Sequence, residues 1–497
     1  MMRILSSIVF GSAAGLALAS GAQSADLPTK KAPPPPPSTV SCFASFYDYV
    51  SASAKECPLT YMGITVYGQI DAGGGWSAHA SRFNPSYNNG VFSVVSKTSQ
   101  GPAFQLVPNG LSQSNVGIKG KEEFIPGWSF VFDVNTGFDP YSLRLANGPR
   151  SLVENNDRNL IDQNTNSDSS RAGQWDNTRA YAGISNSVFG TLTAGRQYAL
   201  STDLVNNYDP MGGSYAFSLI GFSSTLGAGL GDTEVARYNT SVKYQVTYNN
   251  LRAAAAWQFG GYELGNGSNG AFQVGVGADY AGFSVDAIYS HAKDAVSLST
   301  YGSNPLPAGV IQTDLKATLA DINAGIIGAK YVNGPFKLFG GYEYDRYRPP
   351  SDTYPDGFGT LGGYTVLPGA VSVTNYINNK ILQVAWFGAT YSIRPDLDIT
   401  GAYYYAVQNN FLPATGVPSC GPNTTVSDAT GGRLLQGAAN SYCAGHEHAV
   451  SGLLDWRPLK RLDVYGGVMI SQVNGGLASG FFHTNNVAPT VGLRLTF

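Results

Sequence analysis

Apolar and polar residues alternate one by one over short stretches of this chain, and the pattern recurs from residue 64 to the last residue. In residues 490–497 every odd position is apolar, ending at Phe497, and every even position is polar or glycine. Because the side chains of a β-strand point to opposite faces in turn, such a stretch has one apolar and one polar face. Turn residues bound sixteen stretches of this kind. They lie near 64–72, 114–123, 128–137, 177–185, 190–197, 239–248, 251–260, 270–280, 283–292, 323–332, 336–347, 380–392, 397–408, 446–456, 462–473 and 486–497.

The connections between these expected strands are short and long in turn. Asn249-Asn250 and Asn333-Gly334 are suited to tight turns, because Asn and Gly tolerate positive φ angles. Short turns at one end and long loops at the other are typical of single-chain barrels of the bacterial outer membrane. The pattern therefore predicts an all-β fold, a transmembrane antiparallel β-barrel of 16 strands. The short connections are 124–127, 186–189, 249–250, 281–282, 333–335, 395–396 and 458–461, and the long ones are 73–113, 138–176, 198–238, 293–322, 348–379 and 409–445, with shorter examples at 261–269 and 474–485.

Charged residues fall on one face of the expected strands. Lys243 alternates with Val242 and Tyr244, and Asp133 alternates with Phe132 and Val134. A charge that faces lipid near the midplane costs about 2–4 kcal/mol, so we assign the charged face to the lumen. A barrel of sixteen to eighteen strands leaves an aqueous channel rather than a packed core. A water-filled bore is therefore expected.

The N-terminal residues read as an export signal. Arg3, an apolar run over 4–18 and small residues up to Ala25 are typical of a cleavable signal peptide, with the cut expected between 22 and 25. Residues 26–60 then form a proline-rich segment with a cysteine pair, in which the run Pro33–Pro37 favours polyproline II. It is either a periplasmic spacer along the cell wall or an unstructured tail. Residues 61–497 are the expected barrel domain.

Composition supports this division and excludes one class of partner. The chain has 61 Gly, 30 Tyr and 24 Phe in 497 residues, which fits strands that bend and carry aromatic anchors at the membrane interface. A net charge of −3 gives no sign of nucleic-acid binding. The four cysteines allow three connectivities, of which Cys42–Cys57 and Cys420–Cys443 are favoured because each closes a short loop. Zinc binding is the alternative, but neither pair has close thiol spacing.

Six segments follow one another in a characteristic order and spacing: VYGQID at 66–71, VGIKGKEE at 116–123, TRAYAGI at 178–184, FGTLTAGRQY at 189–198, RYNTSVKY at 237–244 and the closing strand 490–497. Together they resemble the general diffusion porins of the Gram-negative outer membrane, and the resemblance extends over nearly all of residues 60–497. The terminal Phe497 also resembles the signal recognised by the barrel-assembly machinery.

This resemblance implies a homotrimer whose third outside loop, here 198–238, folds into the lumen and narrows it. It also implies carboxylates on that loop opposite a wall of basic residues, and a second outside loop, 138–176, that latches onto the neighbouring subunit. The expected loop acids are Asp203, Asp209, Asp232 and Glu234. Arg179, Arg196 and Arg237 match the family's basic positions, Lys119 and Lys243 are added by face and height, and Lys121 of the second-strand motif completes the basic set.

The sequence departs from the family pattern at three places. Asp209 precedes Pro210, whereas the family's loop-tip acid follows its proline, so the carboxylate that lines the narrowest point stays open. Asn115 stands where the family often has arginine. Alternation groups Arg196 with Leu192 on the lipid side unless Gly195 makes a bulge, and we expect the lumen because a lipid-facing arginine near the midplane is unfavourable; near the rim it could snorkel instead.

Other motifs do not predict chemistry. His446-Glu447-His448 places two imidazoles on one strand face, but nothing nearby completes a metal-ligand set. No serine motif stands with the five histidines, so catalysis is not expected. The glycines around Gly227, Gly229 and Gly231 lack a following strand–helix unit and do not predict phosphate binding. Neither a metal nor a cofactor is expected.

The expected function is an outer-membrane porin that passes ions and small hydrophilic solutes by passive diffusion. Two alternatives remain: a substrate-selective outer-membrane channel, and a structural or adhesin barrel that acts through its loops. Expected partners are two further copies of the chain, outer-membrane lipid and lipopolysaccharide, the barrel-assembly machinery, and peptidoglycan through the N-terminal segment. Both termini are expected in the periplasm. Ion preference stays open, because wall cations favour anions and loop acids favour cations.

Overall fold

The computed structural model describes a large part of residues 42–497. The expected signal peptide, the proline run, most of the loop 138–176, Asp232, Glu234, Cys420 and the glycines around 227–231 lie outside the described residues. The described ranges are 42–81, 93–96, 99–141, 143, 179–221, 237–260, 270–299, 314–348, 360–361, 364–373, 378–411, 425–427, 433–435, 443–478 and 481–497.

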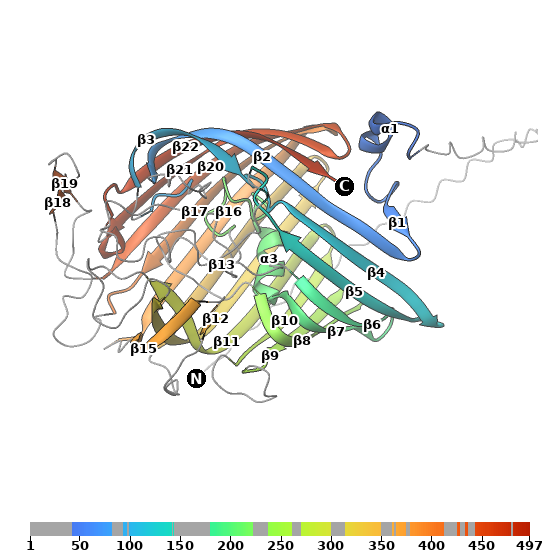
Figure 1. Ribbon diagram of the computed structural model, residues 1–497, viewed down its shortest axis with the longest axis horizontal. Coiled ribbons are helices and arrows are strands. Elements are labelled where there is room, and N and C mark those ends of the chain that lie inside the picture. The colour runs from blue at the N-terminus through green and yellow to red at the C-terminus, as the bar shows by residue number, and fades with distance from the viewer. Residues whose placement is uncertain are drawn as a thin grey trace, which may run out of the picture. The chain divides into compact units, whose positions relative to one another are not determined.

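Sixteen strands close into an antiparallel barrel (Figure 1). The first barrel strand, β2, pairs with β4 on one side and with the last strand, β22, on the other, so the ring has no free edge. The strands of the ring are β2 (Ile64–Ser81), β4 (Asn115–Ile125), β5 (Trp128–Gly137), β6 (Arg179–Asn186), β7 (Gly190–Tyr198), β8 (Arg237–Tyr248), β9 (Leu251–Gln258), β10 (Ala271–Tyr280), β11 (Phe283–Ser299), β12 (Asp314–Asn333), β13 (Phe336–Arg348), β16 (Lys380–Arg394), β17 (Leu397–Gln408), β20 (Gly445–Leu459), β21 (Leu462–Gly475) and β22 (Asn485–Thr496).

All sixteen expected strands are confirmed, and several are longer than expected. The connection expected at 293–322 is largely strand, because β11 and β12 continue their pairing to Ser299 and Lys316. The connection expected at 73–113 contains the end of β2 and the added strand β3 (Ser99–Pro108), which pair with each other. The remaining strands are β1 (Leu59–Tyr61), which pairs with β2, β14 (Thr360–Leu361), β15 (Tyr364–Val373), β18 (Thr425–Ser427) and β19 (Arg433–Leu435).

The two faces of the barrel wall differ as the alternation predicted. On β22, Val491 and Leu493 are 63% and 52% exposed on the outer face, whereas Thr490 on the opposite face is only 2% exposed. Aromatic residues such as Tyr248 and Phe283 are exposed beside the short turns 249–250 and 281–282. Such rings at strand ends are typical of a membrane–water interface. We refer to the end of the barrel with the short turns as the short-turn end and to the other as the long-loop end.

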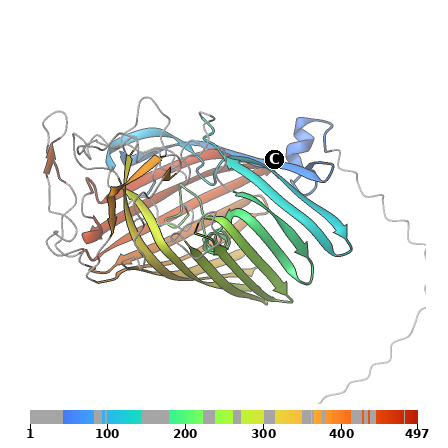
Figure 2. The same ribbon diagram turned by 60° about the horizontal axis from the view of Figure 1, so that its bottom comes forward.

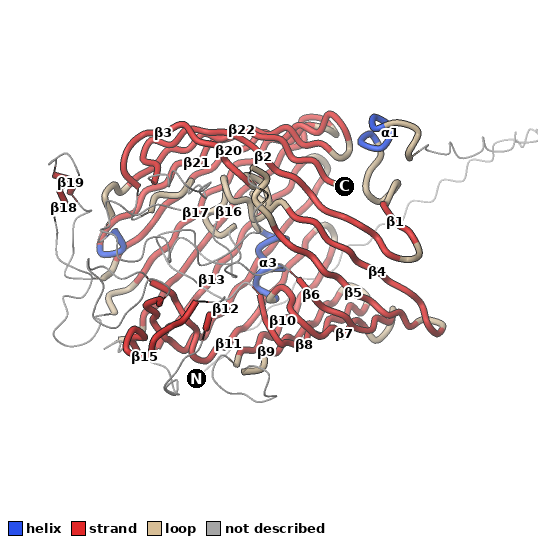
Figure 3. Tube along the Cα trace, in the orientation of Figure 1, coloured by secondary structure: helices blue, strands red, loops and turns tan. Residues whose placement is uncertain are grey.

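The segment after β7 enters the barrel and forms the helix α3 (Leu200–Tyr208) inside it (Figures 2 and 3). Leu200, Leu204, Val205 and Tyr208 are buried and form one apolar face at helical spacing. The backbone N–H of Leu200 donates to the side-chain Oε1 of Gln273 on β10, which satisfies the free start of the helix. Among the described residues, no helix is long and apolar enough to cross a membrane.

Small residues on the inner wall make room for this segment. A Cβ added at Gly328 on β12 would lie 2.7 Å from the Cβ of Tyr208, and one at Gly388 on β16 would lie 2.5 Å from Cγ of Pro210. Both distances are shorter than any normal carbon–carbon contact. These two glycines are therefore required by the close approach of the loop to the wall.

One apolar core joins the loop to the far wall of the barrel. Leu204, Phe217 and Ile220 of the loop belong to the same buried cluster as Trp386 and Met469 of the strands. Loop contacts reach from β8, through the Lys243–Asp203 ion pair, to β21, where the ring of Phe217 meets that of Tyr465 edge-on at 6.2 Å. A segment that contacts strands so far round the ring lies within the bore. The helix α3 contacts β9–β13, and residues from Tyr208 onward contact β16, β17 and β21.

Residues 42–61 form a small disulfide-closed segment at the short-turn end. It contains the helix α1 (Phe46–Ser51), which is capped by the Ser45 side chain, and the Cys42–Cys57 disulfide. Arg461, in the turn between β20 and β21, is buried beneath it. This segment covers the place where the first and last strands of the barrel meet.

Candidate pore constriction

Two basic residues of the wall, Lys119 and Arg179, meet at the ring of Tyr67. The Nζ atom of Lys119 on β4 lies 4.6 Å from the ring centroid of Tyr67 on β2. Nη2 of Arg179 on β6 donates to the hydroxyl of the same tyrosine at 3.0 Å and lies 3.4 Å from the carboxylate of Asp133 on β5. The Tyr67 hydroxyl in turn donates to Asp133. Tyr67 therefore links two of the expected basic residues.

Arg237, at the start of β8, joins this group through a second tyrosine. The guanidinium carbons of Arg179 and Arg237 lie 5.0 Å and 5.3 Å from the ring centroid of Tyr198. An aromatic face attracts a cation within about 6 Å. The structure thus brings Lys119, Arg179 and Arg237 together along two tyrosine rings.

An acid of the inner loop meets the basic wall at Lys243. Its Nζ atom forms an ion pair with the carboxylate of Asp203 on α3 and donates to the backbone carbonyl of Tyr198 at 3.1 Å. The Lys243 side chain is 8% exposed, whereas that of Asp203 is 36% exposed. The expected juxtaposition of loop acid and wall cation is therefore present in this pair.

Asp209 does not line the bore, contrary to the expectation. It is only 2% exposed, and its carboxylate accepts hydrogen bonds from the Tyr404 hydroxyl and from the backbone N–H of Gly213 at 2.7 Å. The chain turns at Pro210 into the apolar core, which draws the preceding carboxylate away from water and onto these donors. Asp209 therefore fixes the loop internally.

The strand register contradicts the expectation that Arg196 faces the lumen. Arg196 pairs with Ala180, and its neighbours Thr193 and Gln197 are hydrogen-bonded to each other on the opposite, inner face. The extra residue of the bulge lies in β8, where Thr240 has a φ of +42°, although Gly195 of β7 also has a positive φ of +129°. Arg196 shares the face of its partner Ala180, is only 6% exposed, and donates to the side chain of Asn239.

The remaining expected residues take separate positions. Lys121 lies on the same face of β4 as Lys119, two residues closer to the short-turn end. Phe497 exchanges two backbone hydrogen bonds with Gly68 of β2, at 2.9 and 3.0 Å, so the C-terminal residue completes the seam of the barrel. Cys443 is disulfide-bonded, and its expected partner Cys420 lies outside the described residues, as do the loop acids Asp232 and Glu234.

The His446-Glu447-His448 motif is divided between the two faces of β20. Glu447 is fully buried inside, whereas the rings of His446 and His448 stand 4.9 Å apart beside the Tyr405 ring. Within the described part of the chain, no group of three or more His, Cys, Asp or Glu side chains is placed to hold a metal ion.

Two site residues were missed by the expectations from sequence. Tyr67 and Asp133 connect Lys119 and Arg179, yet neither was assigned to the constriction. Asp133 carried a usable signal, because it alternates with apolar neighbours and is paired across the ladder with Lys119. Tyr67 had only its position on the inner face of β2. Aromatic residues on both faces of strands made that signal weak.

The geometry and the family comparison now agree. The family described as "Gram-negative porin" matches residues 12–412 of the sequence. The chain belongs to this Gram-negative porin family. No curated protein matches it in sequence.

Solved porin structures share this fold at low sequence identity. The anion-selective porin from Comamonas acidovorans superposes with a TM-score of 0.52 at 14% identity, over 87% of this chain and 99% of that one. OmpT, an outer membrane protein of Vibrio cholerae, superposes in its trimer form with a TM-score of 0.50 at 13% identity, over 87% of this chain and 99% of that one. At these identities the likeness shows the fold alone.

The family membership, the closed barrel and the loop inside it together indicate the general function. This porin is an outer-membrane channel for the passive diffusion of ions and small hydrophilic solutes. The substrate-selective channel and the structural barrel are not favoured. The Gram-negative family membership fits a location in the outer membrane.

Proposed function

We propose that this porin forms a weakly anion-preferring diffusion channel whose narrowest part lies between α3 and the wall formed by β2 and β4–β8. The basic wall there consists of Lys119, Arg179, Arg237 and Lys243, and Lys121 lies closer to the short-turn end. Asp203 is the loop acid that faces this wall. Arg196 is left out of the constriction because of its outward register.

The proposal rests on one observation: among the described residues, the carboxylates near the passage are neutralised or buried, whereas two of the basic groups contact only aromatic rings. Asp203 is compensated by Lys243, Asp133 is compensated by Arg179, and Asp209 is buried away from the bore. Within the described residues, tyrosine rings rather than carboxylates are the partners found for Lys119 and Arg237. A cation over a ring keeps its full charge, so these two groups leave a net positive field in the passage.

The assembly and its surroundings follow from the family and the barrel. We expect three copies to associate, with lipid and lipopolysaccharide around their apolar outer faces. In this arrangement the short-turn end faces the periplasm and the long loops face outward, and we expect both termini in the periplasm. Phe497 serves as the recognition residue for the barrel-assembly machinery. The channel performs no catalysis and needs no cofactor.

The domain division also remains a proposal. Residues 1–25 are a signal peptide that is cut between 22 and 25, residues 26–60 are periplasmic, and residues 61–497 are the barrel. The constriction loop spans 198–238. The proline-rich part precedes the disulfide-closed segment in the sequence, and we expect it to act as a tether toward peptidoglycan.

The reversal potential of the purified protein in a planar bilayer tests the ion preference. Under a KCl gradient, the wild type is expected to show a potential of the sign produced by excess chloride flow. The reversal potential of the variant K119Q/R237Q is expected to move toward cation preference. Arg394→Gln, which changes an exposed arginine at the end of β16 next to Asp396, serves as a matched control without effect. A cation-preferring wild type would overturn the proposal.

A further inference from the structure

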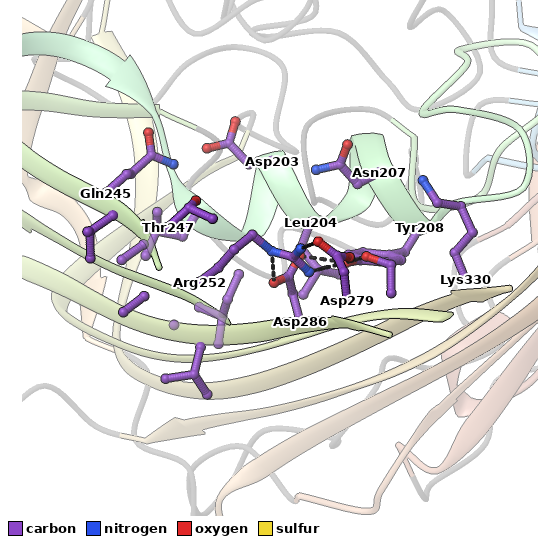
Figure 4. Close-up of a pocket in the computed structure, with 18 residues that line it drawn as sticks. Asp203, Leu204, Asn207, Tyr208, Gln245, Thr247, Arg252, Asp279, Asp286 and Lys330 are labelled. Carbon is purple, nitrogen blue, oxygen red and sulfur yellow. Dashed lines mark hydrogen bonds and ion pairs between the residues drawn. The ribbon is translucent and has the colours of Figure 1, made fainter. Parts of the chain in front are cut away.

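Arg252, which the sequence analysis did not single out, is the centre of a charge network at the C-terminal end of α3 (Figure 4). It stands on β9 close to the short turn 249–250. Its Nε atom lies 3.0 Å from Oδ1 of Asp286, and its Nη1 atom forms an ion pair with Asp279. Its Nη2 atom donates to Ser284 Oγ and to the Tyr208 hydroxyl, both at 3.2 Å. We call Arg252, Asp279, Asp286, Ser284 and Tyr208 the Arg252 network.

Tyr208 connects this network to the constriction helix. It is the last residue of α3, and its hydroxyl donates to Oδ2 of Asp286 at 2.6 Å while lying 2.8 Å from Ser284 Oγ. The backbone carbonyl of Tyr208 accepts a hydrogen bond from Nε1 of Trp386 on β16 at 3.1 Å. The C-terminal end of the helix is therefore held from two sides of the wall.

A cavity of about 380 Å³ lies between α3 and strands β8–β12 beside this network. Leu200, Leu204 and Asn207 line it from the helix, and Thr247 and Lys330 line it from the wall (Figure 4). Close packing therefore fixes the helix where Tyr208 meets Gly328, but not along the cavity, where the wall leaves space next to the helix. The polar contacts of Arg252 bridge the region where packing is incomplete.

We propose that Arg252 is a positioning residue that sets the place of α3 in the bore and so the width and charge of the constriction. This inference rests on the proposed function. A guanidinium group presents its donors in a fixed planar fork, so it can hold two carboxylates and the Tyr208 hydroxyl at once. Without it, Asp279 and Asp286 repel each other and the tyrosine loses its orientation. The helix then moves into the cavity, and the passage on its other side widens.

Single-channel recording of Arg252→Gln tests the proposal. The expected results are a conductance above the wild-type value, larger open-channel current noise and a shifted reversal potential, because Asp203 moves with the helix away from Lys243. Arg252→Lys is expected to restore the wild-type values only in part, since an ammonium group cannot form the planar fork. Tyr208→Phe removes only the hydroxyl and is expected to raise the noise in the same direction.

Arg457→Gln is the matched control. Arg457 also pairs with two carboxylates on the inner wall, Asp398 and Asp455, at 2.9 and 2.8 Å, and these partners lie on β17 and β20 rather than on α3. Wild-type conductance in both Arg252→Gln and Tyr208→Phe would overturn the proposal. If Arg252→Gln fails to fold, Tyr208→Phe alone decides. A wild type that forms no channels would instead contradict the proposed function.

A different observation carries a second inference, about the seam of the barrel. Arg461 in the β20–β21 turn donates Nε to the carbonyls of Tyr49 and Ala52 at 3.0 and 2.9 Å, and Nη2 to those of Ser53 and Cys57. Four carbonyls of one short segment thus converge on a single buried guanidinium. Its carbon also lies 4.1 Å from the Tyr49 ring centroid.

The same segment is tied to the first strand of the barrel. β1 pairs with the start of β2 from Leu59↔Val66 to Tyr61↔Ile64. Between these two attachments, the last strand ends: Thr496 N–H donates to the carbonyl of Arg461, and Phe497 pairs with Gly68. Residues 42–61 therefore bridge from β2 to the β20–β21 turn across the end of β22.

We infer that residues 42–61 form a clasp that closes after β22 has paired with β2 and slows reopening of the barrel at this seam. The Arg461 contacts exist only when the last hairpin and the first strand are both in place. The Cys42–Cys57 disulfide keeps the carbonyl-bearing segment short and closed. Oxidation of the two cysteines therefore strengthens the clasp.

The unfolding rate of the full chain in detergent tests the clasp. It is measured from the difference in gel mobility between the folded barrel and the heat-unfolded chain. In a C420S/C443S background, adding reductant to the folded protein is expected to speed unfolding, and Arg461→Ala is expected to do the same without changing conductance. Arg394→Ala, at the end of β16 beside the neighbouring short turn, is the control with a wild-type unfolding rate. Equal unfolding rates for the oxidised and reduced protein, together with a wild-type rate for Arg461→Ala, would overturn the inference.

Discussion

The ammonium group of Lys243 and the carboxylate of Asp203 form an ion pair that joins the barrel wall to the helix inside the bore. Neutralising one partner exposes the charge of the other. A unit charge about 4–8 Å from a passing ion in water changes its energy by roughly 0.5–1 kcal/mol. We therefore expect Asp203→Asn to favour anions and Lys243→Gln to favour cations, each by about two- to five-fold in the permeability ratio.

Reversal potentials in a KCl gradient measure both variants. Opposite shifts are the specific result, because a general disturbance of the loop would move both variants in one direction. Shifts of the same sign in the two variants would contradict the role of this pair.

The tyrosine-linked wall gives a second prediction. The variant K119Q/R179Q is expected to shift the reversal potential toward cations, because it removes two wall charges and leaves Asp133 without its guanidinium partner. Lys121→Gln is the graded control, since this residue lies on the same face but closer to the short-turn end. A larger effect of Lys121→Gln than of the double variant would place the narrowest point elsewhere.

The close approach of α3 to β12 gives a third prediction. Gly328→Ala places a methyl carbon 2.7 Å from the Cβ of Tyr208, so the helix must move away from this wall. Overpacking of this kind costs about 1–3 kcal/mol of stability. The helix then moves into the passage, and a lower single-channel conductance is expected.

Gly325→Ala on the same strand is the matched control, because no atom lies within 4 Å of a Cβ built there. It is expected to keep the wild-type conductance and thermal stability. Equal conductance of the two variants would show that the loop does not rest on Gly328.

Asp209 separates a structural role from a conducting one. Asp209→Ala leaves the Tyr404 hydroxyl and the Gly213 N–H without their acceptor, which costs about 1–3 kcal/mol for buried groups. A lower thermal unfolding temperature is expected, with a much smaller change in reversal potential than for Asp203→Asn. A shift in reversal potential as large as that of Asp203→Asn would show that Asp209 lines the constriction.

The clasp has a pH dependence at Glu56. The hydrogen bond from Lys460, followed by the backbone N–H of Ser53, lowers the pKa of this carboxyl from 4.5 to about 2. Because the folded-state pKa is the lower one, the contribution to stability is complete above about pH 4.5 and is lost as the pH falls toward 2.

Unfolding rates between pH 5 and pH 2 measure this contribution, with roughly a few-fold acceleration expected for the wild type over that range. Glu56→Gln removes the titrating group and is expected to show less acceleration. Equal pH profiles would mean that the Lys460–Glu56 pair does not hold the segment.

The strands were predictable because their signal is local. Alternation such as that of Val491 and Arg494 depends only on which side of one strand faces lipid, so a single sequence contains it. The lumen positions expected for Lys119 and Lys243 followed from the same rule, whereas Arg179 was expected from the family resemblance.

The remaining features depend on distant residues. Alternation within β7 already grouped Arg196 with the lipid side, and the expected lumen position relied on a bulge at Gly195, whereas the extra residue lies in the neighbouring strand at Thr240. Asp209 looked like a loop acid because the Tyr404 hydroxyl that donates to it comes from β17, 195 residues later in the chain. Arg461 looked like an ordinary turn residue because the segment that covers it lies about four hundred residues earlier in the chain.

The central claim, an open water-filled bore, is tested most directly by the single-channel conductance of the purified protein at increasing KCl concentration. An aqueous pore without a strong binding site predicts stepwise currents that are linear in voltage and rise in proportion to salt over the whole range. A conductance that saturates at low salt, or a folded protein that gives no steps, would contradict the account.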